Sequence, residues 1–349
     1  RDRDYTEGGR RMANIKNRSL SEEFLVEINK IIDYILNENK FVVTSHINPD
    51  GDNIGSSLAM CGFLEALNKE YIYLLDDAYP SSLVFLNREG LRKTSDQVPS
   101  LEGYTVIAQD SGSYERICMD KDLLETSRGI ICIDHHHTNG DYGFINYIDA
   151  KASSTCELVY NIITRYEDIK ARPIIGPEIG TCLYAGLVTD TGNFQYSNTE
   201  PSSFLMAADL IARGAKKQLV IENIYQKNSP AYYRILGECL NNLEIIDSKI
   251  CIAIVTKEML DKYGLEYGDI DAIIPYTRDI DGVELGIFIK QKEIDEIKVS
   301  LRSKSYIDCT ELAAAFDGGG HVRASGCTFR DKSVEEVRNM LLEQAKKLF

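Results

Sequence analysis

The sequence predicts an α/β protein with a mainly parallel sheet in its first domain and a smaller α/β second domain. Short apolar segments rich in β-branched residues alternate with helical patterns over residues 41–213, which is typical of parallel strands that are buried on both faces. Three of these segments run directly into His or Asp, at the end of the strand where such sheets bind ligands. The length of 349 residues also favours two domains.

The expected elements follow in order along the chain. Apolar residues at helical spacing predict a first helix from about Ser21 to Leu36, and a strand at 41–45 then leads into the sequence HINPDGD. A second helix is expected from about Ile54 to Asn68. Further strands are expected at residues 71–75, 104–109 and 129–133. Further helices are expected at residues 154–166, 178–188 and 201–213.

The domain boundary is placed in residues 214–230, which are mixed and polar and end at Ser229-Pro230. We interpret this segment as a linker between a first domain at 19–213 and a second at 231–349. The charged residues 1–18 are interpreted as a disordered leader or an expression remnant. The second domain is expected to contain a helix near 231–244, strands near 250–256, 284–290 and 296–301, and a closing helix from about Ser333.

The composition argues against some classes of function, such as binding of long nucleic acids and spanning of a membrane. The chain has 39 Lys and Arg against 54 Asp and Glu and no dense basic run, so we expect a small anionic ligand and no long nucleic-acid track. No uninterrupted apolar run of about 18 residues occurs, which argues against a membrane span, and the first residues are too polar for a signal peptide. The nine cysteines form no CxxC pair, so we expect buried thiols in a reducing cytoplasm.

The first motif is HINPDGD, which places His46, Asp50 and Asp52 directly after a predicted strand. Imidazole and carboxylate together suit manganese or a similar divalent ion. If the backbone stays extended, the two carboxylates point to different metals, and Gly51 allows a tight turn between them. The alternative is an Asp-Gly turn that only opens the next helix, with Asp52 or Asn53 as the N-cap.

The second motif is DHHHTN, which follows the strand at 129–133. Neighbouring histidines cannot all bind one ion without contortion, but one can bind metal while the next faces the substrate, and the adjacent Asp134 can orient an imidazole. The alternative is a solvated polar loop. Asp110 in QDSG and Asp190 in TDTGNF also end apolar segments. Each alone would be interpreted as a cap or turn residue, but carboxylates gathered at one sheet edge repel one another unless divalent cations are bound.

The third motif is GGGHVRASG at residues 318–326. Its glycines allow the backbone to approach an anion and to form a nest of N–H groups, with His321 and Arg323 adding positive charge. The motif is neither a P-loop nor a dinucleotide fingerprint, because GxxxxGK[ST] and GxGxxG are absent. Arg302 and Lys304 end a predicted strand and are interpreted as a phosphate clamp, with a surface ion pair as the alternative for Arg302.

The ordered set of motifs resembles the DHH phosphoesterase family, and the distal part is similar to its DHH-associated domain of the GGGH type. The resemblance rests on HxxxDxD, an isolated strand-end Asp, DHH, TDTG and GGGH in that order, over about residues 41–329. It implies two manganese ions and an active site in the cleft between the two domains. By this resemblance the first ion is held by His46, Asp50 and Asp110. The second ion is held by Asp52, Asp110, His135 and Asp190.

The resemblance also implies roles outside the ligand set. His136 would contact the scissile phosphate and Asp134 would support the histidines, whereas His137 lies outside the DHH triplet and is given no metal role. The substrate's phosphate or nucleotide would be bound by Arg302, Gly318, Gly319, Gly320 and His321.

Length makes the chain similar to the compact bacterial nanoRNase/pAp phosphatases of this family. That resemblance implies a manganese-dependent phosphodiesterase or exonuclease that hydrolyses very short oligonucleotides to mononucleotides and also dephosphorylates pAp to AMP. Two alternatives stay open: a soluble phosphodiesterase acting mainly on pApA or cyclic di-AMP, and a nucleotide sensor without turnover. The expected partners are short oligonucleotides or nucleotide phosphates, with no membrane, and a homodimer is among the expectations.

Overall fold

The structure, a computed structural model, describes residues 21–349. They form two compact units, of which the first ends at Lys227 and the second runs from Asn228 to Phe349. This division falls inside the segment 214–230 expected to be a linker. Most of that segment is helix α8 (Lys217–Tyr225), which packs on α6 (Pro177–Asp190) and belongs to the first unit. The leader expected at 1–18 lies outside the described residues.

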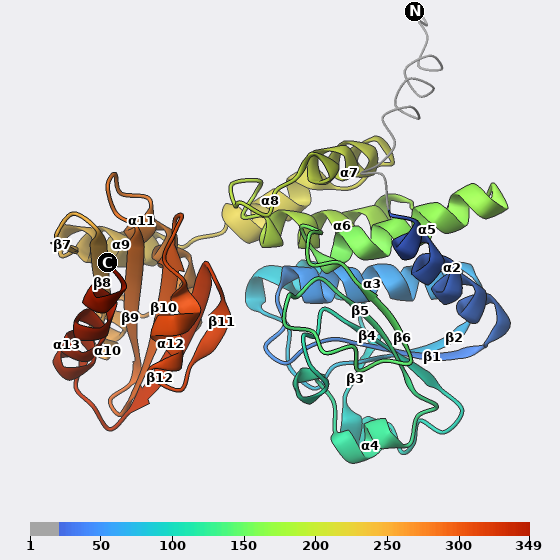
Figure 1. The fold of residues 1–349 in the computed structure, drawn as a ribbon, viewed down its shortest axis with the longest axis horizontal. Coiled ribbons are helices and arrows are strands. Elements are labelled where there is room, and N and C mark those ends of the chain that lie inside the picture. The colour runs from blue at the N-terminus through green and yellow to red at the C-terminus, as the bar shows by residue number, and fades with distance from the viewer. Residues whose placement is uncertain (1–20) are drawn as a thin grey trace, which may run out of the picture. The chain divides into compact units, whose positions relative to one another are not determined.

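Six parallel strands form the sheet of the first unit, in the order β3-β2-β1-β4-β5-β6 (Figure 1). The order reverses between β1 and β4, and open α/β sheets bind ligands at such a reversal, beyond the carboxyl ends of the strands. The strands are β1 (Lys40–Thr44), β2 (Glu70–Leu74), β3 (Arg92–Lys93), β4 (Thr105–Gln109), β5 (Ile130–Asp134) and β6 (Ile145–Ile148). The edge strands β3 and β6 were not predicted, because both are short and partly polar.

Helices cover both faces of this sheet. Successive side chains of β4 belong to different hydrophobic clusters, one on each face of the sheet. Ile107 belongs to the main core under the larger helices, and Val106 belongs to a separate cluster with Leu123 of α4. Figure 1 shows α3, α5 and α6 on one side of the strands and α4 on the other. The helices are α2 (Glu22–Asn37), α3 (Gly51–Ala66), α4 (Lys121–Glu125), α5 (Thr155–Lys170), α6, α7 (Pro201–Ala212) and α8.

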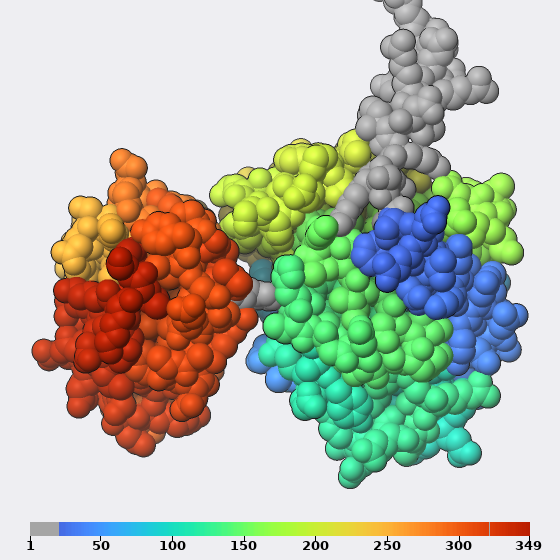
Figure 2. Space-filling model, viewed as in Figure 1, coloured from blue at the N-terminus to red at the C-terminus, as the bar shows by residue number. Residues whose placement is uncertain are grey.

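Helix α2 shows why the sequence pattern was informative. Its N-cap is Ser21, whose Oγ accepts the N–H of Phe24 at 3.3 Å. Its buried residues are Ile28, Ile31, Ile32 and Ile35, and each fully buried side chain of this kind contributes roughly 1.5–3 kcal/mol. The opposite side of α2 is exposed at the surface of the first unit, where Figure 2 shows the helix in dark blue. The amphipathic spacing therefore predicted both the helix and its buried side.

The second unit contains a mixed six-stranded sheet in the order β11-β12-β10-β9-β8-β7. β8 and β9 are parallel and the other neighbouring pairs are antiparallel. The strands are β7 (Glu244–Ile246), β8 (Ile250–Val255), β9 (Leu285–Glu293), β10 (Glu296–Ser303), β11 (Gly319–His321) and β12 (Ala324–Arg330). The helices are α9 (Pro230–Asn241), α10 (Lys257–Tyr263), α11 (Ile274–Arg278), α12 (Cys309–Ala314) and α13 (Val334–Ala345).

The predicted elements of the second unit hold with two changes. Helix α9 is shorter than the predicted 231–244, because β7 begins at Glu244. Residues 319–321, expected to form a nest of N–H groups, instead pair with β12 as an edge strand. The closing helix begins as expected, with Ser333 and Glu336 forming a capping box.

Two expectations from composition can be compared with the described residues. All nine cysteines lie there as free thiols, and all but the half-buried Cys182 are buried. Among the helices at residues 21–349, none is both long and apolar enough to cross a bilayer.

Candidate metal centre

The six predicted ligands lie together at the carboxyl ends of β1, β4 and β5 and at the end of α6. Within the described part of the chain, three overlapping groups bring their ligand atoms within 4.8 Å of one another. The groups are His46, Asp50 and Asp110; Asp110, His135 and His136; and Asp52, His135 and Asp190. Residues that are far apart in the sequence thus form groups that could hold a metal ion.

Asp110 lies at the centre of the site. It follows β4 directly and adopts a left-handed backbone conformation, with φ of 53°, which is uncommon for a residue with a side chain. Its Oδ2 lies 3.3 Å from Nε2 of His46, whereas its Oδ1 lies 3.7 Å from Nε2 of His135. The carboxylate therefore has one oxygen toward each group, as a bridging ligand would.

The HINPDGD loop differs from its expected conformation. Helix α3 begins at Gly51, earlier than predicted, because Oδ1 of Asp50 accepts the N–H groups of Asp52 and Asn53 and caps the helix. The cap is thus Asp50 and neither of the two residues considered. The backbone is helical through Asp52, so the extended arrangement was wrong. Gly51 is needed for close packing, since an added Cβ would overlap the side chain of Thr189 on α6.

Two histidines present the same ring nitrogen to the site. Nδ1 of His46 lies 2.7 Å from the carbonyl oxygen of Ile47, and Nδ1 of His135 lies 3.3 Å from that of Ala152. With Nδ1–H donated to a carbonyl, Nε2 carries the lone pair and faces the carboxylates. Both rings are therefore oriented to bind a metal through Nε2.

Asp134 is fully buried and holds His136. Its Oδ1 lies 2.7 Å from Nδ1 of His136, and its Oδ2 accepts a hydrogen bond from Nδ2 of Asn139 at 2.7 Å. Asn139 also donates to the backbone oxygen of Ser111, which ties the DHH segment to the loop after β4. The sequence had indicated that Asp134 orients an imidazole, but it gave no role to Asn139.

Asp52 is held by the start of helix α5, which sequence reasoning also missed. The N–H groups of Thr155 and Cys156 donate to its two carboxylate oxygens at 2.6 and 2.9 Å. The hydroxyl of Thr155 donates to Oδ1 of Asp110 at 3.1 Å. The sequence SSTCE offers a helix-start signal with Ser154 as N-cap, but nothing in it indicates which carboxylates lie beyond that start.

Asp190 ends helix α6 and is tied to the same region. Nδ2 of Asn198 donates to the backbone oxygens of Asp190 and Ser153, at 3.0 Å each. The carboxylate of Asp190 lies 3.5 Å from Nε2 of His135. One asparagine thus joins the end of α6, which carries Asp190, to Ser153, just before the start of α5.

The electrostatics of the site reflect an excess of negative charge. Burial lowers the pKa of His46, but the hydrogen bond and charge of Asp110 outweigh it and raise that pKa to about 9. Burial likewise lowers the pKa of His135, yet the charges of Asp190 and Asp110 raise it to about 10. Burial raises the pKa of Asp190 to about 7 and, with the charge of Asp110, raises that of Asp52 well above its usual range. The carboxylates of Asp52 and Asp190 therefore attract protons or cations strongly.

The predicted substrate residues of the second unit lie on neighbouring strands. Arg302 of β10 pairs with Ala324 of β12, and β11 with Gly319 and Gly320 lies at the sheet edge. Gly318 precedes β11 at a close contact, where an added Cβ would overlap the backbone oxygen of Gly326. The strands therefore bring Arg302 and the glycine segment into one sheet.

Two cations near the glycine segment, Arg323 and Lys304, form hydrogen bonds to backbone oxygens of the second unit. Arg323 donates to the backbone oxygens of Ile307 and Ser305, so its guanidinium holds these loop residues, and its expected positive charge near the glycine segment stays a prediction. Nζ of Lys304 donates to the backbone oxygen of Ile280. Arg302 also donates to a backbone oxygen, from its Nη1 to that of the adjacent Leu301 at 2.9 Å.

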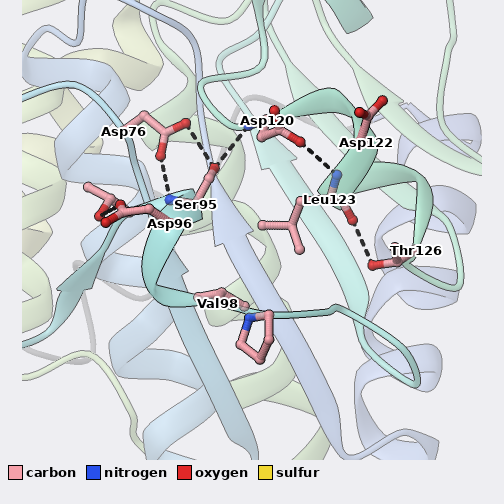
Figure 3. Close-up of a pocket in the computed structure, with 10 residues that line it drawn as sticks. Asp76, Ser95, Asp96, Val98, Asp120, Asp122, Leu123 and Thr126 are labelled. Atoms are coloured by element: carbon pink, nitrogen blue, oxygen red, sulfur yellow. Dashed lines mark hydrogen bonds between the residues drawn. The ribbon is translucent and has the colours of Figure 1, made fainter.

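A separate hollow in the first unit has a volume of about 760 Å³ (Figure 3). It is lined by Asp76, Thr94, Ser95, Asp96, Val98, Pro99, Asp120, Asp122, Leu123 and Thr126. Its polar groups bond to one another: Asp76 accepts the N–H and hydroxyl of Ser95, and Asp120 accepts the N–H of Leu123 at the start of α4. None of the predicted ligands lines it, so it is not the metal centre.

Comparisons with known proteins agree with the geometry. The N-terminal domain of the DHH family matches residues 40–187, and the DHHA1 domain matches residues 247–348. The chain is similar to the bifunctional oligoribonuclease and PAP phosphatase NrnA of Thermus thermophilus, with 30% identity over 314 residues that cover 88% of this chain and 90% of that protein. The protein of the same name from Bacillus subtilis is 27% identical over 293 residues, which cover 82% and 88% of the two chains.

A solved structure is similar over nearly the full length. It is an exopolyphosphatase-related protein from Bacteroides fragilis, with a TM-score of 0.85 and 28% sequence identity. The match covers 95% of this chain and 98% of that one.

Proposed function

The chain belongs to the DHH family and carries its DHHA1 domain; from that premise we propose that it is a metal-dependent phosphoesterase acting on very short oligoribonucleotides and on pAp. The relatives from Thermus thermophilus and Bacillus subtilis are named for these two activities. The observation that carries the proposal is the convergence of all six predicted ligands at one sheet edge, with Asp110 between two groups.

The donor set fits two divalent cations. Imidazole nitrogens and carboxylate oxygens suit manganese and similar ions, and cations relieve the repulsion among the clustered carboxylates. We assign the first ion to His46, Asp50 and Asp110. We assign the second ion to Asp52, Asp110, His135 and Asp190. When bound, such a pair lowers the pKa of a shared water and stabilises charge on the phosphoryl oxygens.

The chain's own residues supply orientation and a proton donor. Asp134 accepts the Nδ1–H of His136, which turns the other ring nitrogen of His136 away from that carboxylate. Burial lowers the pKa of His136, but Asp134 and Asp110 together raise it above its usual value, so the protonated ring is favoured. His136 then stabilises the phosphoryl charge or protonates the leaving oxygen. The DHH segment needs no Ser or Cys nucleophile in this scheme.

Selection of the substrate is assigned to the second unit. Arg302, Gly318, Gly319, Gly320 and His321 would bind the phosphate or nucleotide that is not cleaved. A guanidinium forms strong charge-assisted hydrogen bonds to phosphate, and a glycine edge strand lets a ligand approach the backbone. The net charge of −15 disfavours binding of long polyanions. Free, buried thiols support action in a reducing cytoplasm, and a homodimer stays a prediction.

One experiment compares this proposal with its alternatives. Purified protein is freed of metal with a chelator, reloaded with Mn²⁺, Mg²⁺, Co²⁺ or Zn²⁺, and incubated with pAp, pApA, cyclic di-AMP and RNA of increasing length. We expect hydrolysis of pAp and of the shortest RNAs, with a steep decline as RNA length increases and the highest rate with Mn²⁺. Preference for pApA or cyclic di-AMP would favour the soluble phosphodiesterase. Binding of a nucleotide without hydrolysis of any substrate would favour the alternative of a nucleotide sensor without turnover.

A further inference from the structure

Helix α5 begins in the buried layer next to the metal centre, and side-chain hydrogen bonds fix the position of its first residues. Oγ of Ser154 accepts the N–H of Glu157 at 3.2 Å, and Oε2 of Glu157 accepts the N–H and hydroxyl of Ser153 at 2.9 and 2.7 Å. Ser153, Ser154 and Thr155 have no solvent exposure. The first N–H groups of this helix are therefore fixed in direction, and they have no partner within the helix itself.

Asp52 takes two of these N–H groups. Thr155 donates to its Oδ2 at 2.6 Å and Cys156 to its Oδ1 at 2.9 Å. Because each oxygen accepts one bond from a fixed backbone, the plane of the Asp52 carboxylate is set by helix α5. The positive end of the helix also favours the ionised form of that carboxylate.

The Thr155 side chain reaches the second carboxylate. Its Oγ1 donates to Oδ1 of Asp110 at 3.1 Å, and this is the oxygen that lies 3.7 Å from His135 and 3.7 Å from His136. The other oxygen of Asp110 lies on the His46 side, at 3.3 Å. Thr155 thus contacts Asp52 through its backbone and Asp110 through its hydroxyl.

The hydroxyl is not needed to begin the helix. Ser154 is the N-cap, and Thr155 is the first residue of the helix, so its own helix offers no carbonyl one turn earlier for the Thr155 hydroxyl to bond, unlike that of Thr164. Oγ1 of Thr164 donates to the carbonyl of Tyr160 at 2.9 Å, which is the ordinary arrangement for threonine in a helix. The bond from Thr155 to Asp110 therefore serves the site.

We propose that Thr155 is a positioning residue, whose hydroxyl fixes the rotation of the Asp110 carboxylate relative to Asp52 and thereby sets the affinity of the paired metal centre. The inference rests on the proposed function in one respect, that the site binds divalent ions. An Asp110 carboxylate without this bond rotates about its Cβ–Cγ bond and presents Oδ1 less often in the direction shared with His135. Metal affinity then falls while the fold is unchanged.

The test compares Thr155→Val with two other variants of the full chain. Valine has nearly the shape of threonine and keeps the backbone N–H to Asp52, so it removes only the hydroxyl. Thr155→Ser restores the hydroxyl, and Thr164→Val removes a hydroxyl from the same helix away from the site. Mn²⁺ binding to chelator-treated protein is measured by calorimetry. The paramagnetic resonance spectrum then reports paired against free Mn²⁺, and thermal unfolding without metal reports the fold.

We expect Thr155→Val to weaken Mn²⁺ binding by about 10- to 100-fold, as loss of groups that orient metal ligands does. Its spectrum should gain the signal of free Mn²⁺ at the metal ratio that fills the wild-type site. Thr155→Ser should recover binding, and Thr164→Val should bind as the wild type does. All variants should unfold near the wild-type temperature without metal.

Three results overturn the inference in distinguishable ways. If wild-type protein binds Mn²⁺ and Thr155→Val binds it equally well, the inference fails while the proposed function stands. If wild-type protein binds no divalent ion, the metal centre itself is refuted, and the inference with it. A Thr155→Val variant that unfolds without metal at a much lower temperature, with Thr155→Ser equally affected, would assign the residue to the fold instead.

Discussion

The two units hold their candidate residues in contrasting ways. In the first unit the ligands lie at strand and helix ends within a buried network, where Asp134 is bonded to both His136 and Asn139. In the second unit the candidates lie on β10 and on the edge strand β11, and an added Cβ at Gly319 meets no atom within 4 Å. The contrast teaches that the two proposed roles rest on different surroundings. The proposed cleavage site has side chains fixed by hydrogen bonds, whereas the proposed selection site has one open position at Gly319 between the closely packed Gly318 and Gly320.

The strongest test of the contrast is Asp110→Ala in the first unit. Because Asp110 lies between both ligand groups, its loss should abolish metal binding and lower turnover by about 1000-fold or more. Calorimetry with Mn²⁺ and the rate of pAp hydrolysis provide the measurements. Asp96→Ala is the matched control, since Asp96 accepts a bond from Thr94 in the separate hollow and should leave both quantities unchanged. Wild-type turnover in Asp110→Ala would refute the bridging assignment.

The second test asks where the second unit is rigid. Gly320 has φ of 143°, and an added Cβ would lie 2.6 Å from the backbone oxygen of Ala324. Gly320→Ala should therefore lower the free energy of unfolding by roughly 2–4 kcal/mol, measured by urea denaturation. Gly319→Ala is the control beside it and should stay within about 0.5 kcal/mol of wild type. Equal losses in both variants would mean that the edge strand is closely packed throughout.

Asp134→Asn tests orientation without removal of a ligand. The amide no longer accepts the Nδ1–H of His136 as a carboxylate does, so we expect kcat to fall by roughly 10- to 100-fold. Mn²⁺ affinity and KM should stay near the wild-type values, because Asp134 is not among the assigned ligands. An unchanged kcat with a raised KM would instead move Asp134 from catalysis to binding.

The smallest effect is expected for Arg302→Ala in the second unit. Loss of a charge-assisted hydrogen bond to phosphate should raise KM for pAp by about 10-fold and leave kcat nearly unchanged. Lys304→Ala is the control, because Nζ of Lys304 already donates to the backbone oxygen of Ile280. If both variants behave alike, the assigned role of Arg302 is wrong.

Prediction from the sequence succeeded where periodicity and strand ends carry the information. Apolar strands followed by His or Asp predicted the parallel sheet and brought together His46, Asp110 and His135. The prediction failed where long-range contacts decide. The need for Gly51 depends on Thr189 of α6, which is distant in the sequence. The start of α3 was misplaced for a local reason, because Asp50 caps the helix and Asp52 and Asn53 do not.

The residues that orient the ligands were missed for the same reason. Thr155 and Asn139 are common polar residues with no local signal, and their importance appears only when Asp52, Asp110 and Asp134 are adjacent in space. The glycine segment was misjudged differently: three glycines permit a nest, but pairing with β12 determines a strand.

The spread of the ligands along the chain, from His46 to Asp190, has a consequence for biosynthesis. As the polypeptide leaves the ribosome, β1 appears early, but α6 and its terminal Asp190 come much later. No complete metal group containing Asp190 therefore exists until α6 has packed against α3. An ion that binds only the native state stabilises that state by mass action. Metal binding would therefore stabilise the completed first unit and would not stabilise partly folded chains. An occupied metal site would then indicate that the first unit has folded completely.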